Sequence, residues 1–164
     1  ATGGAAGASM DASPRGGPPG FVRVADAHTL WIPDASGNNR LDTLSNLLHD
    51  PRIGLVFMVP GIVETLRVNG TVRLRDEEAF TSAFAGPGVP PKLVLEVQVQ
   101  EAYLHCAKSL MRAKLWDVQQ QVKRDVLPSM HAMIHEQIGA PAPQETQQAM
   151  LERYAEQLAR EQWG

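Results

Sequence analysis

Apolar and polar residues alternate along several stretches of the first two thirds of the chain, which is the pattern of half-buried β-strands. The segment Arg52–Gly61 differs, because it is apolar almost throughout and therefore predicts a strand buried on both faces. Asn69 and Gly70 interrupt another stretch and predict either a tight turn or a bulge inside one long strand. The predicted strands are Gly20–Val24, Thr29–Pro33, Arg52–Gly61, Glu64–Arg75 and Lys92–Cys106.

Short helices are predicted between these strands. Leucines recur at helical spacing between positions 41 and 48. This helix should end before Pro51, because the residue preceding a proline disfavours the α conformation. Two further short helices are predicted at Asp76–Phe84 and Ala107–Trp116.

The C-terminal part of the chain has a different character. After Gln119 it is rich in Gln and Glu, and apolar residues at helical spacing predict two tail helices on either side of Gly139–Gln144. Five to six short strands with inserted helices favour a mainly β fold, a compact antiparallel barrel with added helices. A doubly wound parallel fold is not expected, because strands and helices do not alternate throughout the sequence.

Composition narrows the functional classes. The 164 residues are 43% apolar and 20% charged, which suits a globular domain. The net charge of -3 disfavours a nucleic-acid partner, which needs a basic face. The sequence has no apolar run long enough to cross a bilayer and no secretory signal pattern, so we expect a cytoplasmic protein with no membrane partner. The single cysteine, Cys106, excludes an internal disulfide.

The loop before the first predicted helix, PDASGNNRLDT, is the first candidate for chemistry. Two interpretations stay open for it. In the first, Asn39 caps the helix and Asp42 completes a weak capping box. In the second, the loop binds an anion such as phosphate, because Arg40 otherwise places a cation at the positive end of the helix macrodipole. Thr43 would add a hydroxyl.

Two other segments carry cations suited to an anion. SPRGGPPG places Arg15 in a rigid stretch rich in Gly and Pro, for which an ordinary surface turn is the alternative interpretation. Lys108 and Arg112 stand four residues apart on a predicted helix and repel each other mildly, which a shared anionic partner would relieve. A solvated basic face is the alternative for that pair.

The sequence shows neither a metal site nor a familiar catalytic motif. His131 and His135 stand four apart on a tail helix, but no third ligand accompanies them. His105 and Cys106 are adjacent on a strand and therefore point to opposite faces. Dinucleotide, P-loop and serine-hydrolase motifs are absent from the sequence. We therefore predict no metal and assign no catalytic residue.

Four motifs follow one another in the first 117 residues: MDASPRGGPPGFVRV, TLWIPDASGNNRLDTLSNLLHDPRIGLVFMVPG, ETLRVNG and AYLHCAKSLMRAKLW. Together they resemble the pyridoxamine 5'-phosphate oxidase-related family of FMN-binding split barrels, in particular the subgroup with the GNNRLDT and HCAK-RxKLW motifs. The resemblance implies a six-stranded antiparallel split β-barrel in residues 1–118. Residues 119–164 would form a helical C-terminal extension.

The resemblance also implies a homodimer with two FMN sites at the subunit interface. The residues expected at the FMN phosphate are Ser13, Arg15, Asn38, Asn39, Arg40 and Thr43. The backbone expected beside the flavin ring is that of Ile32, Pro33 and Asp34. The residues expected at a site edge, of the same or of the partner subunit, are Lys108, Arg112 and Trp116.

The function implied is that of an FMN-dependent oxidoreductase with a small-molecule redox substrate. The alternatives are a flavin carrier without turnover, a split barrel that binds a deazaflavin or haem, and a structural dimer with an empty groove. Pyridoxamine phosphate oxidation is not expected, because the sequence lacks the basic strand motif and the C-terminal substrate motif of those enzymes. Members of the family usually begin with a helix and a first strand, most of which this sequence lacks, so the resemblance predicts an exposed sheet edge.

Overall fold

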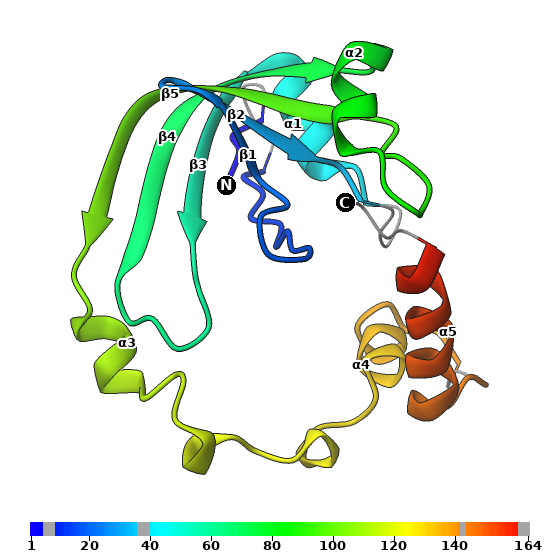
Figure 1. Ribbon diagram of the computed structural model, residues 1–164. Coiled ribbons are helices and arrows are strands. Elements are labelled where there is room, and N and C mark those ends of the chain that lie inside the picture. The colour runs from blue at the N-terminus through cyan, green and yellow to red at the C-terminus, as the bar shows by residue number, and fades with distance from the viewer. Residues whose placement is uncertain (5–8, 36–39, 142–143, 161–164) are drawn as a thin grey trace. The chain divides into compact units, whose positions relative to one another are not determined.

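The structure is a computed structural model that describes residues 1–4, 9–35, 40–141 and 144–160 (Figure 1). The chain forms two compact units, Ala1–Trp116 and Asp117–Arg160. The first unit contains the β-sheet, and the described part of the second contains helices and turns only.

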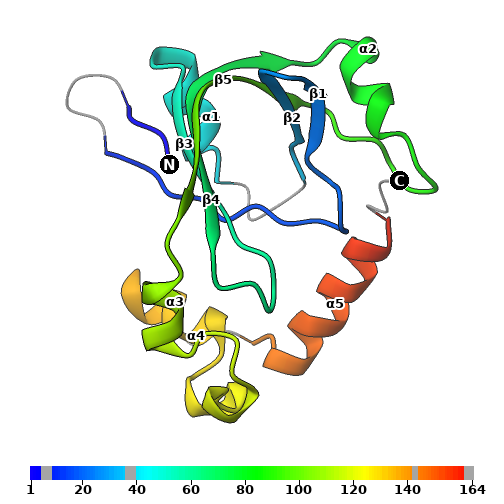
Figure 2. The ribbon, with the colours of Figure 1, turned by 60° about the vertical axis from the view of Figure 1, so that its left-hand side comes forward.

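A five-stranded sheet forms the centre of the first unit, with every neighbouring pair antiparallel. The strand order is β1-β2-β5-β4-β3, so β5 is central and pairs with both β2 and β4. Figure 2 shows the long strands β4 and β5 curving strongly along their length. The strands are β1 (Arg23–Asp26), β2 (Thr29–Pro33), β3 (Arg52–Phe57), β4 (Thr65–Arg75) and β5 (Val94–His105).

Three short helices and a 3₁₀ turn complete the first unit. α1 (Asp42–His49) connects β2 to β3, and α3 (Lys108–Ala113) follows β5. α2 (Glu78–Thr81) and the 3₁₀ turn Ser82–Phe84 connect β4 to β5. The helices predicted at these places are confirmed, although α3 is shorter than predicted because Lys114 ends it in a left-handed conformation with φ 48°.

The start of α1 corrects one prediction. The helix begins at Asp42, and its N-cap residue is Leu41 rather than Asn39. The Leu41 side chain makes no capping hydrogen bond, because an apolar side chain has no acceptor for the free backbone N–H groups. The leucines at positions 41, 44, 47 and 48, whose helical spacing predicted one common face, are not buried together, since Leu47 is buried whereas Leu41 and Leu48 are exposed.

The described residues correct the predicted strand number from six to five. Beside the edge strand β3, Thr2 forms isolated bridges with Ile53 and with Asp11 instead of a sixth strand. The Thr2 amide donates to the Asp11 carbonyl at 2.9 Å, and the Asp11 amide donates back to Thr2 at 3.0 Å. The edge that we expected to be exposed is therefore paired at Ile53, and Asp11 is fixed close to the sheet.

β3 is an edge strand, and the prediction that it is buried on both faces is wrong, because side chains on one of its faces are exposed. It ends at Phe57, and Met58 and Val59 lie in the connection to β4. Val56, Met58 and Val59 are 59%, 48% and 56% exposed. An apolar run can thus belong to a strand with one uncovered face, and a contiguous exposed apolar patch is typical of an interaction surface.

The bulge alternative at Asn69-Gly70 is confirmed. β4 continues through both residues, and its register with β5 shifts between them. A Cβ atom added at Gly70 would lie 2.2 Å from the carbonyl oxygen of Gln98 on β5. The two backbones approach each other closely here, which only glycine permits.

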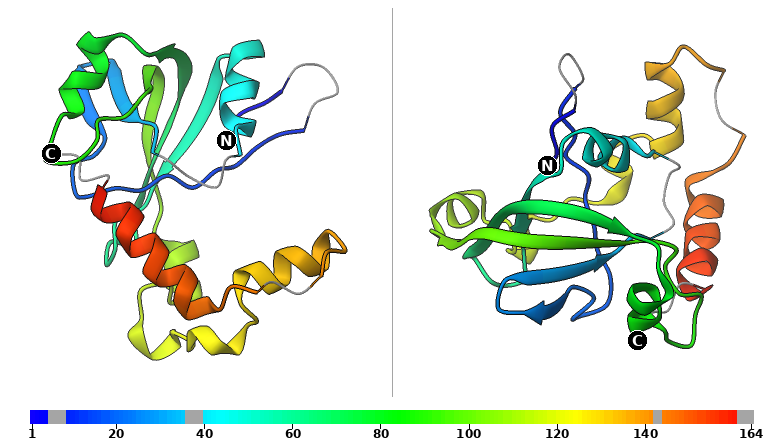
Figure 3. Two further views of the ribbon diagram at one scale, coloured as in Figure 1. Left: turned by 90° about the vertical axis from the view of Figure 1, so that its right-hand side faces the viewer. Right: turned by 90° about the horizontal axis from the view of Figure 1, so that it is seen from above.

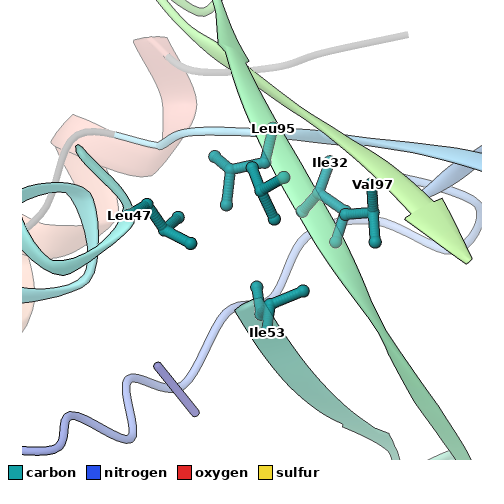
Figure 4. Packing of buried hydrophobic residues seen from close by; sticks show 6 residues of the cluster. Ile32, Leu47, Ile53, Leu95 and Val97 are labelled. Atoms are coloured by element: carbon teal, nitrogen blue, oxygen red, sulfur yellow. The ribbon is translucent and has the colours of Figure 1, made fainter. Parts of the chain in front are cut away.

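Buried side chains from β2, β3, β4, β5 and α1 form one hydrophobic core. Leu95 and Val97 on the central strand are completely buried. Figure 4 shows Leu47 of α1 in the same cluster, with Ile32 and Ile53 on neighbouring elements. This packing holds α1 against the sheet, so the first turn of α1 lies close to β3.

The second unit confirms the predicted tail helices, which are α4 (Met130–Gln137) and α5 (Gln147–Arg160). Glu145 accepts two hydrogen bonds from Arg153, each 2.9 Å long, and lies 3.0 Å from His131 Nδ1. One carboxylate therefore contacts side chains from both helices. None of the helices in the described ranges has the length and apolar character needed to cross a bilayer.

Gly70→Ala should lower the free energy of unfolding by about 1–3 kcal/mol, the usual effect of overpacking. The added methyl group would meet the Gln98 carbonyl oxygen, which cannot move without disturbing the β4–β5 ladder. Gly54→Ala on β3 is the matched control, because the nearest atom to its added Cβ is a side-chain oxygen of Asn69 at 3.4 Å. Chemical denaturation measures both variants, and equal destabilisation would contradict the close approach at Gly70.

Candidate functional site

A pocket of about 310 Å³ lies between the segment before β1, the first turn of α1 and the edge strand β3. Figures 2 and 3 show the segment before β1 passing beside α1 on its way from β3 to β1. The volume is at the lower end of the range for small-molecule sites. The polar side chains that line it are those of Thr2, Ser13, Arg15 and Thr43. The apolar residues of the lining are Ala1, Pro14, Phe21, Val22, Ile32, Ile53, Gly54, Leu55, Val56, Phe57 and Met58.

β3 supplies the largest apolar wall of the pocket. Ile53, Leu55 and Phe57 alternate along the strand, so their side chains share one face of the sheet. Phe57 stands opposite Leu66 on β4, and Leu66 stands opposite Leu104 on β5. Cross-strand partners lie on the same face. The wall therefore continues beyond the pocket as an apolar row in which Leu66 is 38% and Leu104 is 75% exposed.

The polar end of the pocket joins two segments that are distant in the sequence. Ser13 precedes β1, and Thr43 is a buried residue in the first turn of α1. The Ser13 hydroxyl donates to Asp11 Oδ2 at 2.8 Å, and the Thr43 hydroxyl donates to the same oxygen. Asp11 lies behind these hydroxyls, outside the pocket lining. Its carboxylate therefore fixes both segments at the rear of the site.

These contacts lower the pKa of the Asp11 carboxyl below its ordinary value. The Thr43 hydroxyl is the largest cause, burial acts in the opposite direction, and the Ser13 hydroxyl contributes a smaller lowering. Asp11 is therefore ionised at neutral pH and can only accept hydrogen bonds. Because the folded-state pKa is depressed, the associated stability is present above the unfolded-state pKa and is lost as the pH falls through the folded-state value.

Arg15 is the one cationic side chain among the described residues that line this pocket. Its Nη1 donates to Asp34 Oδ1, and both side chains are partly buried. Asp34 follows β2 directly and is held by its own amide, which donates to the Leu93 carbonyl at 2.9 Å. A guanidinium has five N–H donors, and the contact with Asp34 uses only one nitrogen. Asp34 can therefore orient Arg15 while the other donors bind an anion.

Arg40 lies ahead of α1 and is outside the pocket lining. Its Nε donates to Asp42 Oδ2 at 2.8 Å, and this hydrogen bond is the main reason that the pKa of Arg40 is raised. Asp42 also offsets the unfavourable position of a cation near the positive end of the helix. A phosphate contact of Arg40 stays a prediction. Asn38 and Asn39 are outside the described residues.

Lys108, Arg112 and Trp116 lie on or shortly after α3, and none of them lines the pocket. The Trp116 indole donates to the Ile62 carbonyl at 2.7 Å. This hydrogen bond attaches the segment after α3 to the β3–β4 connection. The flavin contacts expected for the three residues stay a prediction.

The end of β2 lies at the site, and the flavin contact expected for its backbone stays a prediction. Ile32 lines the pocket, Pro33 is buried beside it, and Asp34 is connected to the pocket through Arg15. Sequence reasoning missed Asp11 as the residue that joins the two segments. The available signal was its position two residues before Ser13 within the motif MDASPRGG. It also missed the apolar wall, although the alternation of Ile53, Leu55 and Phe57 was visible.

Comparison with known proteins identifies the family. A family profile described as Pyridoxamine 5'-phosphate oxidase matches residues 1–106, which is more than half of the chain. The chain therefore belongs to the pyridoxamine 5'-phosphate oxidase family. Membership of this family implies that the sheet belongs to a split barrel, and members of the family commonly bind FMN. No curated protein matches the chain.

Two crystal structures of HupZ from Group A Streptococcus are similar to part of this chain. A histidine-to-alanine variant has 22% sequence identity and a TM-score of 0.44, covering 54% of this chain and 76% of HupZ. A second HupZ structure has 20% identity and a TM-score of 0.43, covering 51% of this chain and 68% of HupZ. Similarities of this size carry no argument about the ligand.

The residues of the pocket fit FMN. Arg15 supplies donors for a phosphate, and its carboxylate partner Asp34 lies outside the described lining of the pocket. Phe21, Ile32 and Leu55 supply apolar surface for a flat aromatic ring. The pocket thus has the charged end and the apolar end that this cofactor requires.

Thr43→Val should raise the pKa of Asp11 toward its ordinary value, and Ser13→Ala should raise it by less. The reason is that the Thr43 hydroxyl makes the larger contribution. The stability advantage of the wild type over Thr43→Val should also shrink as the pH falls through the folded-state pKa of Asp11. An NMR titration of the Asp11 carboxyl carbon measures the shifts. A larger rise in Ser13→Ala than in Thr43→Val would contradict the assignment.

Proposed function

We propose that this protein binds FMN in the pocket at Arg15 and acts as a flavin-dependent oxidoreductase on a small-molecule substrate. One observation carries the proposal: Arg15 is the one cationic side chain among the described lining residues, and it stands at the polar end of a pocket whose other walls are mainly apolar. A guanidinium binds phosphate through charge-assisted and bidentate hydrogen bonds. Membership of a family that commonly binds FMN supports the same ligand.

The part of the protein in such a reaction is to bind and to orient. Bound FMN would supply the redox chemistry. The side chains of the described residues that line the pocket include no His, Asp, Glu, Lys or Cys, so these side chains offer no general acid or base of ordinary strength. Arg15 would hold the phosphate end, while Phe21 and Leu55 would keep water from one side of the ring.

The same lining favours a second candidate, a flavin carrier without turnover, because holding FMN requires no acid or base. Anaerobic addition of NADH or NADPH to the FMN-loaded protein separates the two functions. Loss of the oxidised flavin absorbance supports the oxidoreductase, and unchanged absorbance supports the carrier. A protein that binds haem or a deazaflavin but not FMN, or that binds none of these, would contradict both.

We also infer that the protein is a homodimer whose interface borders the pocket. Met58 follows β3, lines the pocket and is at the same time exposed. The apolar row Phe57, Leu66 and Leu104 extends from the pocket wall across β4 to β5. A second copy of the chain would bury this row and cover the open side of the pocket. The split barrel that the family implies supports this assembly.

Arg15→Gln should weaken FMN binding at least tenfold, because loss of a charge-assisted contact costs about 1.5–3 kcal/mol. Arg52→Gln is the matched control, since Arg52 is 80% exposed, pairs with Asp50 and lies outside this pocket lining. Fluorescence titration with FMN measures the affinities. If Arg15→Gln binds FMN as tightly as the wild type does, Arg15 is not the phosphate ligand.

Leu104→Glu should shift the protein from dimer to monomer and weaken FMN binding, because it buries a charge in the inferred interface. Val24→Glu is the control, since Val24 is 74% exposed but lies on β1, outside the apolar row. Sedimentation equilibrium measures the masses of the wild type and both variants. A monomeric wild type, or a Leu104→Glu variant that remains dimeric, would contradict the interface.

A further inference from the structure

Ser13 and Thr43 direct their hydroxyl hydrogens away from the pocket that they line. Ser13 Oγ lies 2.8 Å from Asp11 Oδ2, and Thr43 Oγ1 contacts the same oxygen. Asp11 itself does not line the pocket. Both hydrogen bonds therefore run from the pocket wall to a carboxylate behind it.

The chemistry of these groups fixes the direction of the hydrogen bonds. An ionised carboxylate has no hydrogen, so each hydroxyl must be the donor. The lowered pKa of Asp11 keeps it ionised at neutral pH. A Ser or Thr hydroxyl has one hydrogen and two lone pairs, so only its capacity to accept remains for the pocket. The wall formed by Ser13 and Thr43 therefore suits ligand groups that donate.

Arg15 has the opposite hydrogen-bonding character to Ser13 and Thr43. Its guanidinium only donates, and Asp34 occupies only Nη1. Phosphate oxygens at neutral pH mainly accept, so they match Arg15 and do not match hydroxyls that already donate to Asp11. At the polar end of the pocket, Arg15 thus suits ligand groups that accept hydrogen bonds, whereas Ser13 and Thr43 suit ligand groups that donate them.

The position of Asp11 is restrained by its backbone. Thr2 and Asp11 exchange amide-to-carbonyl hydrogen bonds of 2.9 and 3.0 Å, and Thr2 is bridged in turn to Ile53 on β3. If the two hydroxyls rotated toward a phosphate, Asp11 would lose both donors and face a second negative charge. This arrangement therefore opposes a phosphate at Ser13 and Thr43.

We propose that Asp11 is a positioning residue that sets the ligand specificity of the pocket. It directs the hydroxyls of Ser13 and Thr43 to accept hydrogen bonds from the polyol hydroxyls of the ligand, and it leaves the phosphate to Arg15. The inference rests on the proposed FMN function and deepens it by assigning a part of the ligand to each residue. It removes Ser13 and Thr43 from the phosphate, where the family resemblance placed them.

The test compares the affinities of FMN and riboflavin, which share the ring and the polyol chain and differ in the phosphate. Ser13→Ala and Thr43→Val should each weaken both ligands by the same factor, about two- to tenfold, the effect of losing one neutral hydrogen bond. Arg15→Gln should weaken FMN at least tenfold and riboflavin by less than about twofold. Variants of Ser13 and Thr43 that weaken FMN while leaving riboflavin unchanged would overturn the proposal.

Asp11→Asn supplies a second measurement in the same titrations. The amide keeps the shape of Asp11 but removes the charge that fixes the direction of the hydroxyls, so both can then donate to a phosphate. The ratio of FMN affinity to riboflavin affinity should rise by at least about threefold. A purely structural role of Asp11 would weaken both ligands equally, and an unchanged ratio would overturn the proposal.

Two controls keep the outcomes separate. Thermal unfolding shows whether each variant is folded, and Ser13→Ala and Thr43→Val decide the question if Asp11→Asn does not fold. A wild type that binds neither FMN nor riboflavin contradicts the proposed function and, with it, the role of Asp11. A wild type that binds both, with Ser13→Ala and Thr43→Val variants that change FMN affinity alone, contradicts the role of Asp11 and leaves the proposed function intact.

Discussion

The burial of Leu95 and Val97 on β5 is the constraint on which the rest of the first unit depends. β5 is hydrogen-bonded to β2 on one side and to β4 on the other, so these two side chains lie at the centre of the sheet. Leu47 packs into the same cluster and thereby holds α1 against the sheet. The first turn of α1 then brings Thr43 to Asp11, which the bridge through Thr2 has fixed beside β3. Hydrophobic packing thus assembles a polar site.

The polar groups of the site differ in the hydrogen-bonding capacity that remains for a ligand. Ser13 and Thr43 each have one hydroxyl hydrogen, and Asp11 takes both. Arg15 has five N–H donors, and its contact with Asp34 uses one nitrogen. A carboxylate beside a hydroxyl therefore changes the kind of ligand group that the hydroxyl binds, whereas a carboxylate beside a guanidinium mainly orients it.

The strands and helices of this unit could be predicted because alternation and helical spacing depend on local burial. The predictions failed where the burial of a strand depends on which elements lie beside it. The apolar run of β3 resembles a central strand, but no local pattern shows that it stands at the sheet edge with Val56 exposed. β1 begins at Arg23, later than predicted, because Gly20 has φ 85° in a turn closed by a hydrogen bond from the Phe21 amide to Pro18.

The site could also be predicted only in part. Motifs identified Ser13, Arg15 and Thr43 as candidates, and the structure gathers them at one pocket. Asp11, the hydrogen-bond partner of Ser13 and Thr43, was not predicted. Asp11 and Thr43 are 32 positions apart, and residue spacing does not encode such a contact. For the same reason the sequence suggested one role for all three, whereas the geometry gives hydroxyls and guanidinium different roles.

A crystal structure of the protein with FMN tests the central claim most directly. The account predicts that the FMN phosphate lies within hydrogen-bond distance of the Arg15 guanidinium. It also predicts that the Ser13 and Thr43 hydroxyls remain on Asp11 and accept hydrogen bonds from the polyol chain. A phosphate held by Ser13 and Thr43 with Asp11 displaced, or an FMN molecule bound away from Arg15, would contradict it.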